Sequence, residues 1–136
     1  MKYYLLASLS VWERFRRAFI VQDRWKLYLE GLRNTLIIAG IAALIGIVLG
    51  VLCATVNYIH KKNGKLRIPS AICRLYITLV RGTPVVLQLM ILYFVVFVSW
   101  KNGIMIGAIT FGINSGAYVA EIARAGFESV DDGQME

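Results

Sequence analysis

The residues best suited to chemistry lie in the last quarter of the chain, from Phe111 to Glu136. Projected on a helix at about 100° per residue, Asn114, Tyr118 and Glu121 fall together on one face. The opposite face carries small residues, namely Ala108, Gly112, Gly116 and Ala120. Small side chains let another helix approach closely, whereas an amide, a phenol and a carboxylate offer hydrogen bonds and charge to a polar solute. The pattern predicts a transmembrane helix with one packing face and one polar face.

Glu121 is the ionisable residue that comes closest to lying inside an apolar segment, which makes it a functional candidate. A structural interpretation stays open, in which this carboxylate sits at the membrane edge and pairs with Arg124 one turn later. The chain has one histidine, no acidic pair within an apolar segment, and no nucleophile at a defined spacing from a base. We therefore predict that the protein is not an enzyme. No metal-ligand spacing, phosphate-binding loop or RNA-binding motif is present, so we predict neither a metal or other cofactor nor a nucleic-acid partner.

The apolar residues come in long blocks, and these blocks decide the fold class. The chain is 58% hydrophobic, with a mean hydropathy of +0.64. No charged residue occurs in 34–59, 82–100 or 102–120. Because about 20 helical residues cross the roughly 30 Å hydrocarbon core, we predict an all-α polytopic membrane protein. Its three transmembrane helices should span about 32–58, 84–100 and 104–124. A soluble helical bundle is the disfavoured alternative.

Each of the first two spans has a recognisable local pattern. Small residues recur along the first at steps of four and three, which predicts a helix-packing seam of Ala39, Ala43, Gly46, Gly50 and Cys53. The two cysteines, Cys53 and Cys73, are interpreted as packing residues. The second span is expected to begin with Thr83 as N-cap and Pro84 at the first helical position. A glutamine one turn later, Gln88, is interpreted first as a helix–helix hydrogen bond and second as a substrate ligand.

The segment before the first span is basic and aromatic. Residues 11–30 mix Trp12, Phe15 and Trp25 with several arginines, which predicts an amphipathic helix lying in the membrane interface; a solvated leader is the alternative. We therefore divide the chain into an interfacial segment, 1–30, and a membrane domain, 31–136. Six Lys and Arg between Tyr58 and Thr83 favour a cytoplasmic position for 59–83, although the basic N-terminal segment favours the opposite orientation.

Two stretches resemble a known family in order and spacing. The first is R-G-T-P-V-V-L-Q-L-M-I-L-Y, residues 81–93, and the second is S-G-A-Y-V-A-E-I-A-R-A-G-F-E-S-V-D-D-G-Q-M-E, residues 115–136. They resemble the permease subunits of bacterial ABC importers for polar amino acids of the histidine, glutamine and arginine type. The resemblance covers about residues 31–136 and implies part of the type I ABC importer permease fold. It also implies that the chain is cut at the start of the EAA motif, about 129–136, so we expect this 136-residue form to insert without transporting.

The resemblance implies a function, partners and residue roles. The function is ATP-driven translocation of a polar amino acid across the bacterial plasma membrane, with the N-terminus outside and residue 136 in the cytoplasm. The expected partners are cytoplasmic ABC ATPases, an external or periplasmic substrate-binding protein, a second permease subunit, identical or not, and membrane lipid. The first family signature comprises Arg81, Gly82, Thr83, Pro84 and Gln88. The ATPase-coupling residues are Gly133, Gln134 and Glu136. The candidates for the substrate path are Asn114, Ser115, Tyr118 and Glu121. The alternative function is a small membrane protein that interacts or regulates without transporting.

Overall fold

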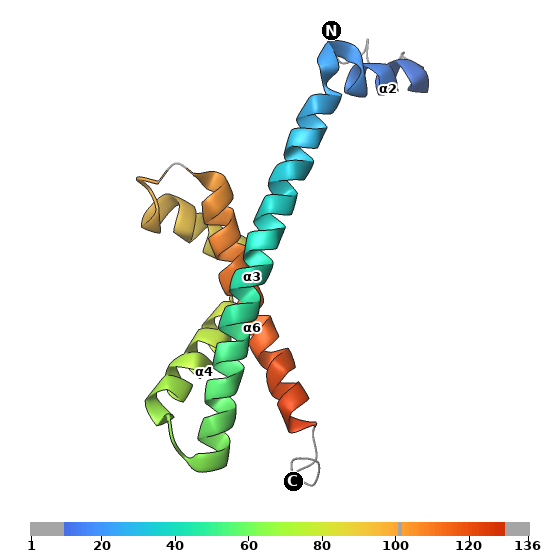
Figure 1. Ribbon diagram of the computed structural model, residues 1–136. Coiled ribbons are helices and arrows are strands. Elements are labelled where there is room, and N and C mark those ends of the chain that lie inside the picture. The colour runs from blue at the N-terminus through green and yellow to red at the C-terminus, as the bar shows by residue number, and fades with distance from the viewer. Residues whose placement is uncertain (1–9, 101, 130–136) are drawn as a thin grey trace. The chain divides into compact units, whose positions relative to one another are not determined.

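All the regular structure in the computed structural model, which describes residues 10–100 and 102–129, is helical (Figure 1). The order is α2 (Val11–Phe19), the 3₁₀ turn η1 (Val21–Asp23), α3 (Trp25–Asn63), α4 (Arg67–Gly82), α5 (Val85–Ile91), the π-helical η2 (Leu92–Val96) and α6 (Gly103–Glu128). The all-α class is confirmed. The chain divides into two compact units, residues 1–36 and 37–136, and each is described by itself.

The first unit contains a break that the sequence did not predict. Helix α2 starts at an N-cap, Ser10, whose hydroxyl accepts a hydrogen bond from the backbone N–H of Glu13. It ends before Gln22 and Asp23, which both adopt left-handed backbone conformations. The expected amphipathic helix over 11–30 is therefore two helices. An exposed ion pair lies at this break, since the Asp23 carboxylate is 2.8 Å from Lys26 Nζ in the first turn of α3.

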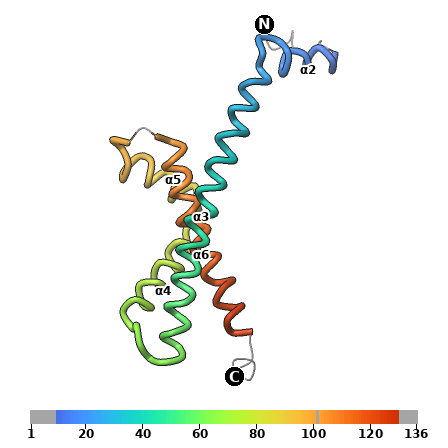
Figure 2. Tube along the Cα trace, in the orientation of Figure 1, coloured from blue at the N-terminus to red at the C-terminus, as the bar shows by residue number. Residues whose placement is uncertain are grey.

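The second unit begins within α3, whose 39 residues are about twice the number needed to cross a hydrocarbon core. The chain turns after α3, since this helix ends at Asn63 and Gly64 has a φ of +67°. Helix α4 then folds back toward α3 (Figure 2). A hydrogen bond of 2.8 Å from the Ser70 hydroxyl to the Asn57 side-chain oxygen joins these two helices.

The second predicted span differs most from the structure. It was expected as one helix over 84–100, but α5 and η2 together cover only residues 85–96, about 18 Å of helix. This segment follows α4 across a bend of 106°. Two helical segments of the described chain, Val21–Asn63 and Gly103–Glu128, are long and apolar enough to cross a membrane. The bent pair adds a third span if it crosses as one broken element.

The core of the second unit is the crossing of α3 and α6. The predicted small-residue stripe of α6 is confirmed, because Ala108, Gly112, Gly116 and Ala120 are all buried. On α3 the buried small residues are Ala42, Gly46, Gly50 and Ala54. Gly46 and Gly50 were predicted, but Ala39 and Ala43 are exposed and Cys53 is half-buried. The contact follows steps of four residues along α3, as expected for helices that cross at their glycines.

Candidate functional site

Arg81, near the end of α4, contacts two residues on the predicted polar face of α6. Its Nη1 lies 2.8 Å from the Glu121 carboxylate, and its guanidinium carbon lies 5.5 Å from the centre of the Tyr118 ring. A guanidinium over an aromatic face is attracted by the ring quadrupole. Arg81 therefore joins two sequence segments 37 or more residues apart: the R-G-T-P stretch and the polar face that leads toward the chain end.

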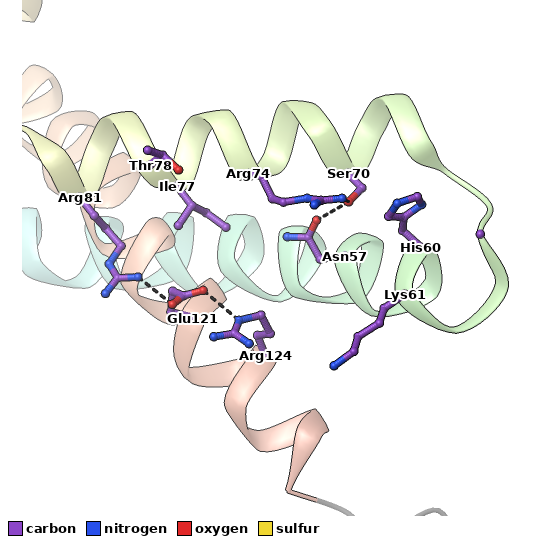
Figure 3. A pocket seen from close by; sticks show the side chains of 11 residues that line it. Asn57, His60, Lys61, Ser70, Arg74, Ile77, Thr78, Arg81, Glu121 and Arg124 are labelled. Atoms are coloured by element: carbon purple, nitrogen blue, oxygen red, sulfur yellow. Dashed lines mark hydrogen bonds and ion pairs between the residues drawn. The ribbon is translucent and has the colours of Figure 1, made fainter.

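Glu121 is held from two sides. Its second carboxylate oxygen accepts from Arg124 Nε at 3.0 Å, three residues later on the same helix (Figure 3). The edge-charge interpretation, in which Glu121 pairs with Arg124, thus matches the geometry. The chain of charges continues, because Arg124 also pairs with Glu128 at 2.8 Å and Glu128 pairs with Lys61 of α3 at 2.8 Å. These ion pairs connect the C-terminal end of α6 to the C-terminal ends of α3 and α4.

A pocket of about 700 Å³ opens between α3, α4 and α6 beside this network. Its lining comprises Asn57, His60, Lys61, Gly64, Ser70, Arg74, Ile77, Thr78, Arg81, Glu121 and Arg124. The pocket has two chemically different ends (Figure 3). At one end the carboxylate of Glu121 pairs with both Arg81 and Arg124. At the other, Arg74 lies beside Asn57 and Ser70, which are neutral.

The four residues expected along a substrate path are not brought together. Tyr118 and Glu121 share Arg81, but Asn114 donates to the side-chain oxygen of Gln88 at 3.4 Å. Ser115 faces Gly46, where an added Cβ would come within 2.7 Å of the serine hydroxyl oxygen. Ser115 therefore sits in the α3–α6 packing interface, and Asn114 in the contact between α5 and α6.

The family signature around Pro84 forms the break between α4 and α5. Arg81 and Gly82 are the last residues of α4, and Thr83 is its C-cap. Pro84 is the N-cap of α5, so the predicted roles of Thr83 and Pro84 are wrong by one position. The reason is that α4 continues to Gly82, so its C-terminus uses Thr83, whose hydroxyl donates to the Leu79 carbonyl.

Gln88 stabilises this break from within α5. Its side-chain nitrogen donates to the Val80 carbonyl at 2.8 Å and to the Thr83 hydroxyl at 2.8 Å. The Val80 carbonyl belongs to the last turn of α4, where carbonyls lack helical partners, and Thr83 is the C-cap of the same helix. Its oxygen takes the Asn114 hydrogen bond, so the structural interpretation of Gln88 fits its contacts. The expected coupling residues, Gly133, Gln134 and Glu136, lie outside the described residues.

Sequence reasoning did not single out the polar residues around Arg74 at the other end of the pocket, Asn57, Ser70 and Arg74 itself. Asn57 lies two residues before the end of the uncharged run of α3, and Arg74 lies in the middle of α4. A signal was present, since Ser70 and Arg74 are four residues apart and thus on one face of a helix. The sequence did not show that α4 folds back on α3, which places this face against Asn57.

Comparison with known families identifies the chain. Residues 46–136 match the family described as "Binding-protein-dependent transport system inner membrane component". The protein belongs to this family. The match includes both signature stretches and the α3–α6 crossing, so the family pattern covers the site described above.

Several relatives of this chain are permeases of amino-acid transport systems. The chain is 41% identical over 111 residues to a putative glutamine transport system permease of Rickettsia prowazekii, covering 79% of this chain and 49% of that protein. It is 39% identical over 113 residues to the arginine transport system permease ArtQ of Bacillus subtilis, covering 79% and 48%. It is 33% identical over 114 residues to the glutamine permease GlnP of Escherichia coli, covering 81% and 50%. The chain thus spans about half the length of these relatives.

A solved structure supports the same family fold. It is a crystal structure of an amino acid ABC transporter with histidines, which superposes with a TM-score of 0.72 at 29% identity. The superposition covers 93% of this chain and 55% of the other. The helices described here therefore form part of an amino-acid ABC transporter permease fold, and the protein is a multi-pass membrane protein.

Proposed function

We propose that this protein is the permease subunit, or part of it, of an ATP-driven importer that translocates a polar amino acid across the bacterial plasma membrane. The observation that carries this proposal is the family match over residues 46–136, together with relatives that are permeases for glutamine and arginine. The permease itself catalyses no reaction; a separate cytoplasmic ABC ATPase supplies the energy.

The substrate path runs along the polar face of α6, with Tyr118 and Glu121 as its best-supported members. Both are accessible and both contact Arg81 of the other signature segment. A guanidinium, a phenol and a carboxylate together complement the carboxylate and ammonium of a zwitterionic amino acid. Asn114 and Ser115 have weaker support, because each is engaged in a contact between helices.

The implied partners are two cytoplasmic ATPases, an external or periplasmic substrate-binding protein, and a second permease subunit that forms a homodimer or heterodimer. The residues that follow α6, including Gly133, Gln134 and Glu136, would transmit the ATPase motion. The test is to purify the protein from its complete reading frame and measure co-purifying ATPase. Stimulation of ATP turnover by binding protein with glutamine or arginine supports the proposal. A well-folded preparation that binds no ATPase would instead favour a non-transporting membrane protein.

We predict that the turn between α3 and α4 faces the cytoplasm, which places the N-terminus outside. The reason is that residues 59–83 carry six Lys and Arg and no acidic residue. In a background with Cys53 and Cys73 replaced, a cysteine at Asn63 should react with an impermeant thiol reagent only in opened cells. A cysteine at Asn102, at the start of α6, is the matched control and should react in intact cells. The reverse labelling pattern would invert the topology.

A further inference from the structure

Helices α3 and α4 form a hairpin around the turn at Gly64 (Figure 2), and each contributes one cysteine, Cys53 and Cys73. The hydrogen bond from Ser70 to Asn57 fixes which residues of the hairpin face each other. Cys53 lies four residues before Asn57, and Cys73 lies three residues after Ser70. Residues at these spacings share one face of a helix. Both steps lead about one turn away from the Gly64 end of the hairpin, so the register places the two thiols opposite each other.

The side chains agree with this register. Cys53 has Cys73 as its side-chain hydrogen-bond partner. Both cysteines are free thiols, and both are half-buried in the described part of the chain. The sequence was interpreted in terms of two separate packing residues, whereas the fold makes them a pair that is shared by two helices.

The thiol pair lies close to the contact between α4 and α6. Tyr76, one turn after Cys73 on α4, donates a hydrogen bond to the Ile113 carbonyl of α6. A Cβ at Gly116 of α6 would come within 2.7 Å of the Tyr76 hydroxyl oxygen. Among residues 10–100 and 102–129, no group of three or more His, Cys, Asp and Glu side chains is placed to hold a metal ion. The site therefore offers two sulfur ligands and no third ligand of these types.

Two adjacent thiols suit a thiophilic centre that has two open positions. Soft metal ions prefer thiolate ligands to nitrogen and oxygen. An arsenic(III) centre that carries one aryl group has the same preference, and two of its three bonds remain for sulfur. The second bond forms within the same molecule, at the high effective concentration of a neighbouring group, so a pair of thiols holds such a centre far more tightly than one thiol does.

We propose that Cys53 and Cys73 form a dithiol site that is bridged by a thiophilic metal or metalloid centre with two open positions. When the occupant is an arylarsine oxide, two arsenic–sulfur bonds replace the arsenic–oxygen bond, and the two thiol protons leave with the oxygen as water. Neither arsenic nor sulfur changes its oxidation state, so no oxidant is needed. The bridge joins α3 to α4. It lies outside the lining of the pocket that contains Arg81 and Glu121, and the proposal is independent of transport.

The experiment uses protein from the complete reading frame, treated in detergent with phenylarsine oxide. This probe is uncharged, so it can reach a thiol in the uncharged run 34–59. Bound phenylarsenic is measured by intact mass after a wash with excess mercaptoethanol, a monothiol. The unmodified protein should retain one phenylarsenic group more than Cys53→Ala or Cys73→Ala, because each variant leaves a single sulfur. A wash with dimercaptopropanol should then remove this group, since a second dithiol competes for both bonds at once.

The bridge should also stabilise the fold. Phenylarsine oxide should raise the midpoint of thermal unfolding of the unmodified protein, because the two thiols are adjacent only in the folded state. The same treatment should leave the midpoints of Cys53→Ala and Cys73→Ala unchanged. Melts without the probe show whether each variant is folded, and the corresponding serine variants replace an alanine variant that is unstable.

Two outcomes would overturn the proposal. Equal retention of phenylarsenic by the unmodified protein and by either single variant would show that the two thiols do not act together. Absence of a retained group on the unmodified protein would also overturn it, and N-ethylmaleimide then distinguishes the reason. Labelling of both cysteines by this reagent would show thiols that are open but too far apart. Absence of labelling would show a pair that the rest of the permease closes off.

Discussion

Replacing Gly50 by valine should abolish most of the folded permease in the membrane. A Cβ at Gly50 would lie 2.5 Å from the Cβ of Val119 and 2.9 Å from the carbonyl oxygen of Gly116. The second of these atoms belongs to the backbone of α6, so the clash cannot be relieved by a rotamer change. Overpacking of a tight contact costs about 1–3 kcal/mol or more, which is a large part of a typical folding free energy.

Gly40 on the same helix provides the matched control. A Cβ there meets no atom within 4 Å. Gly40→Val should therefore leave stability within about 0.5 kcal/mol, as for most surface substitutions. Both variants are expressed from the complete reading frame, and folded protein is measured by fluorescence-detected size exclusion and thermal melting. If Gly50→Val melts like Gly40→Val, the α3–α6 crossing does not hold the fold together.

Glu121→Gln should reduce amino-acid uptake about tenfold, equivalent to about 1.4 kcal/mol, with insertion and assembly largely retained. The amide keeps the shape of the side chain but loses the charge that holds Arg81 at 2.8 Å and Arg124 at 3.0 Å. Ion pairs at such exposure contribute less than about 1 kcal/mol to stability. The expected loss therefore lies in the positioning of Arg81 over Tyr118 and in contact with substrate, and much less in folding.

Glu128→Gln is the control for this loss, because it removes the same charge and two ion pairs from the same helix. Uptake by this variant should stay within about twofold, since Glu128 does not contact Arg81 and exposed pairs contribute little. The reversed pair, Arg81→Glu with Glu121→Arg, separates the two roles of Glu121. Recovery of uptake would indicate an ion pair that only positions the helices. Normal uptake by well-expressed Glu121→Gln would make this residue a structural edge charge.

The sequence by itself determined the local elements of this protein. Long uncharged blocks predicted apolar helices, and the spacing of small residues predicted that Gly112 and Gly116 pack closely on another helix. Both features depend only on the 3.6-residue period and on side-chain size, which are properties of a single segment. The reversal at Gly64 was predictable for the same reason, since glycine readily adopts a positive φ.

Only the tertiary structure decided which faces meet. The small-residue seam of α3 was placed partly on the wrong face, because two alanines in succession, Ala42 and Ala43, leave the choice to the partner helix. Burial of Ala42 followed from the crossing at Gly46 and Gly50. In the same way, the second span was predicted from its apolar composition as one helix over 84–100, which says nothing about the π-helical segment Leu92–Val96 within it or the 106° bend from α4 that precedes it.

The candidate site shows the same division. Glu121 could be singled out from the sequence, because a carboxylate at the end of an uncharged helix is rare and costly. Its partner Arg81 lies 40 residues away and belonged to a different motif, so no local pattern joined them. Arg74 could not be assigned to a pocket at all until α4 folded back on α3 and set Ser70 against Asn57. Contacts between distant segments depend on how whole helices pack, and that information is spread over all the residues at their interfaces.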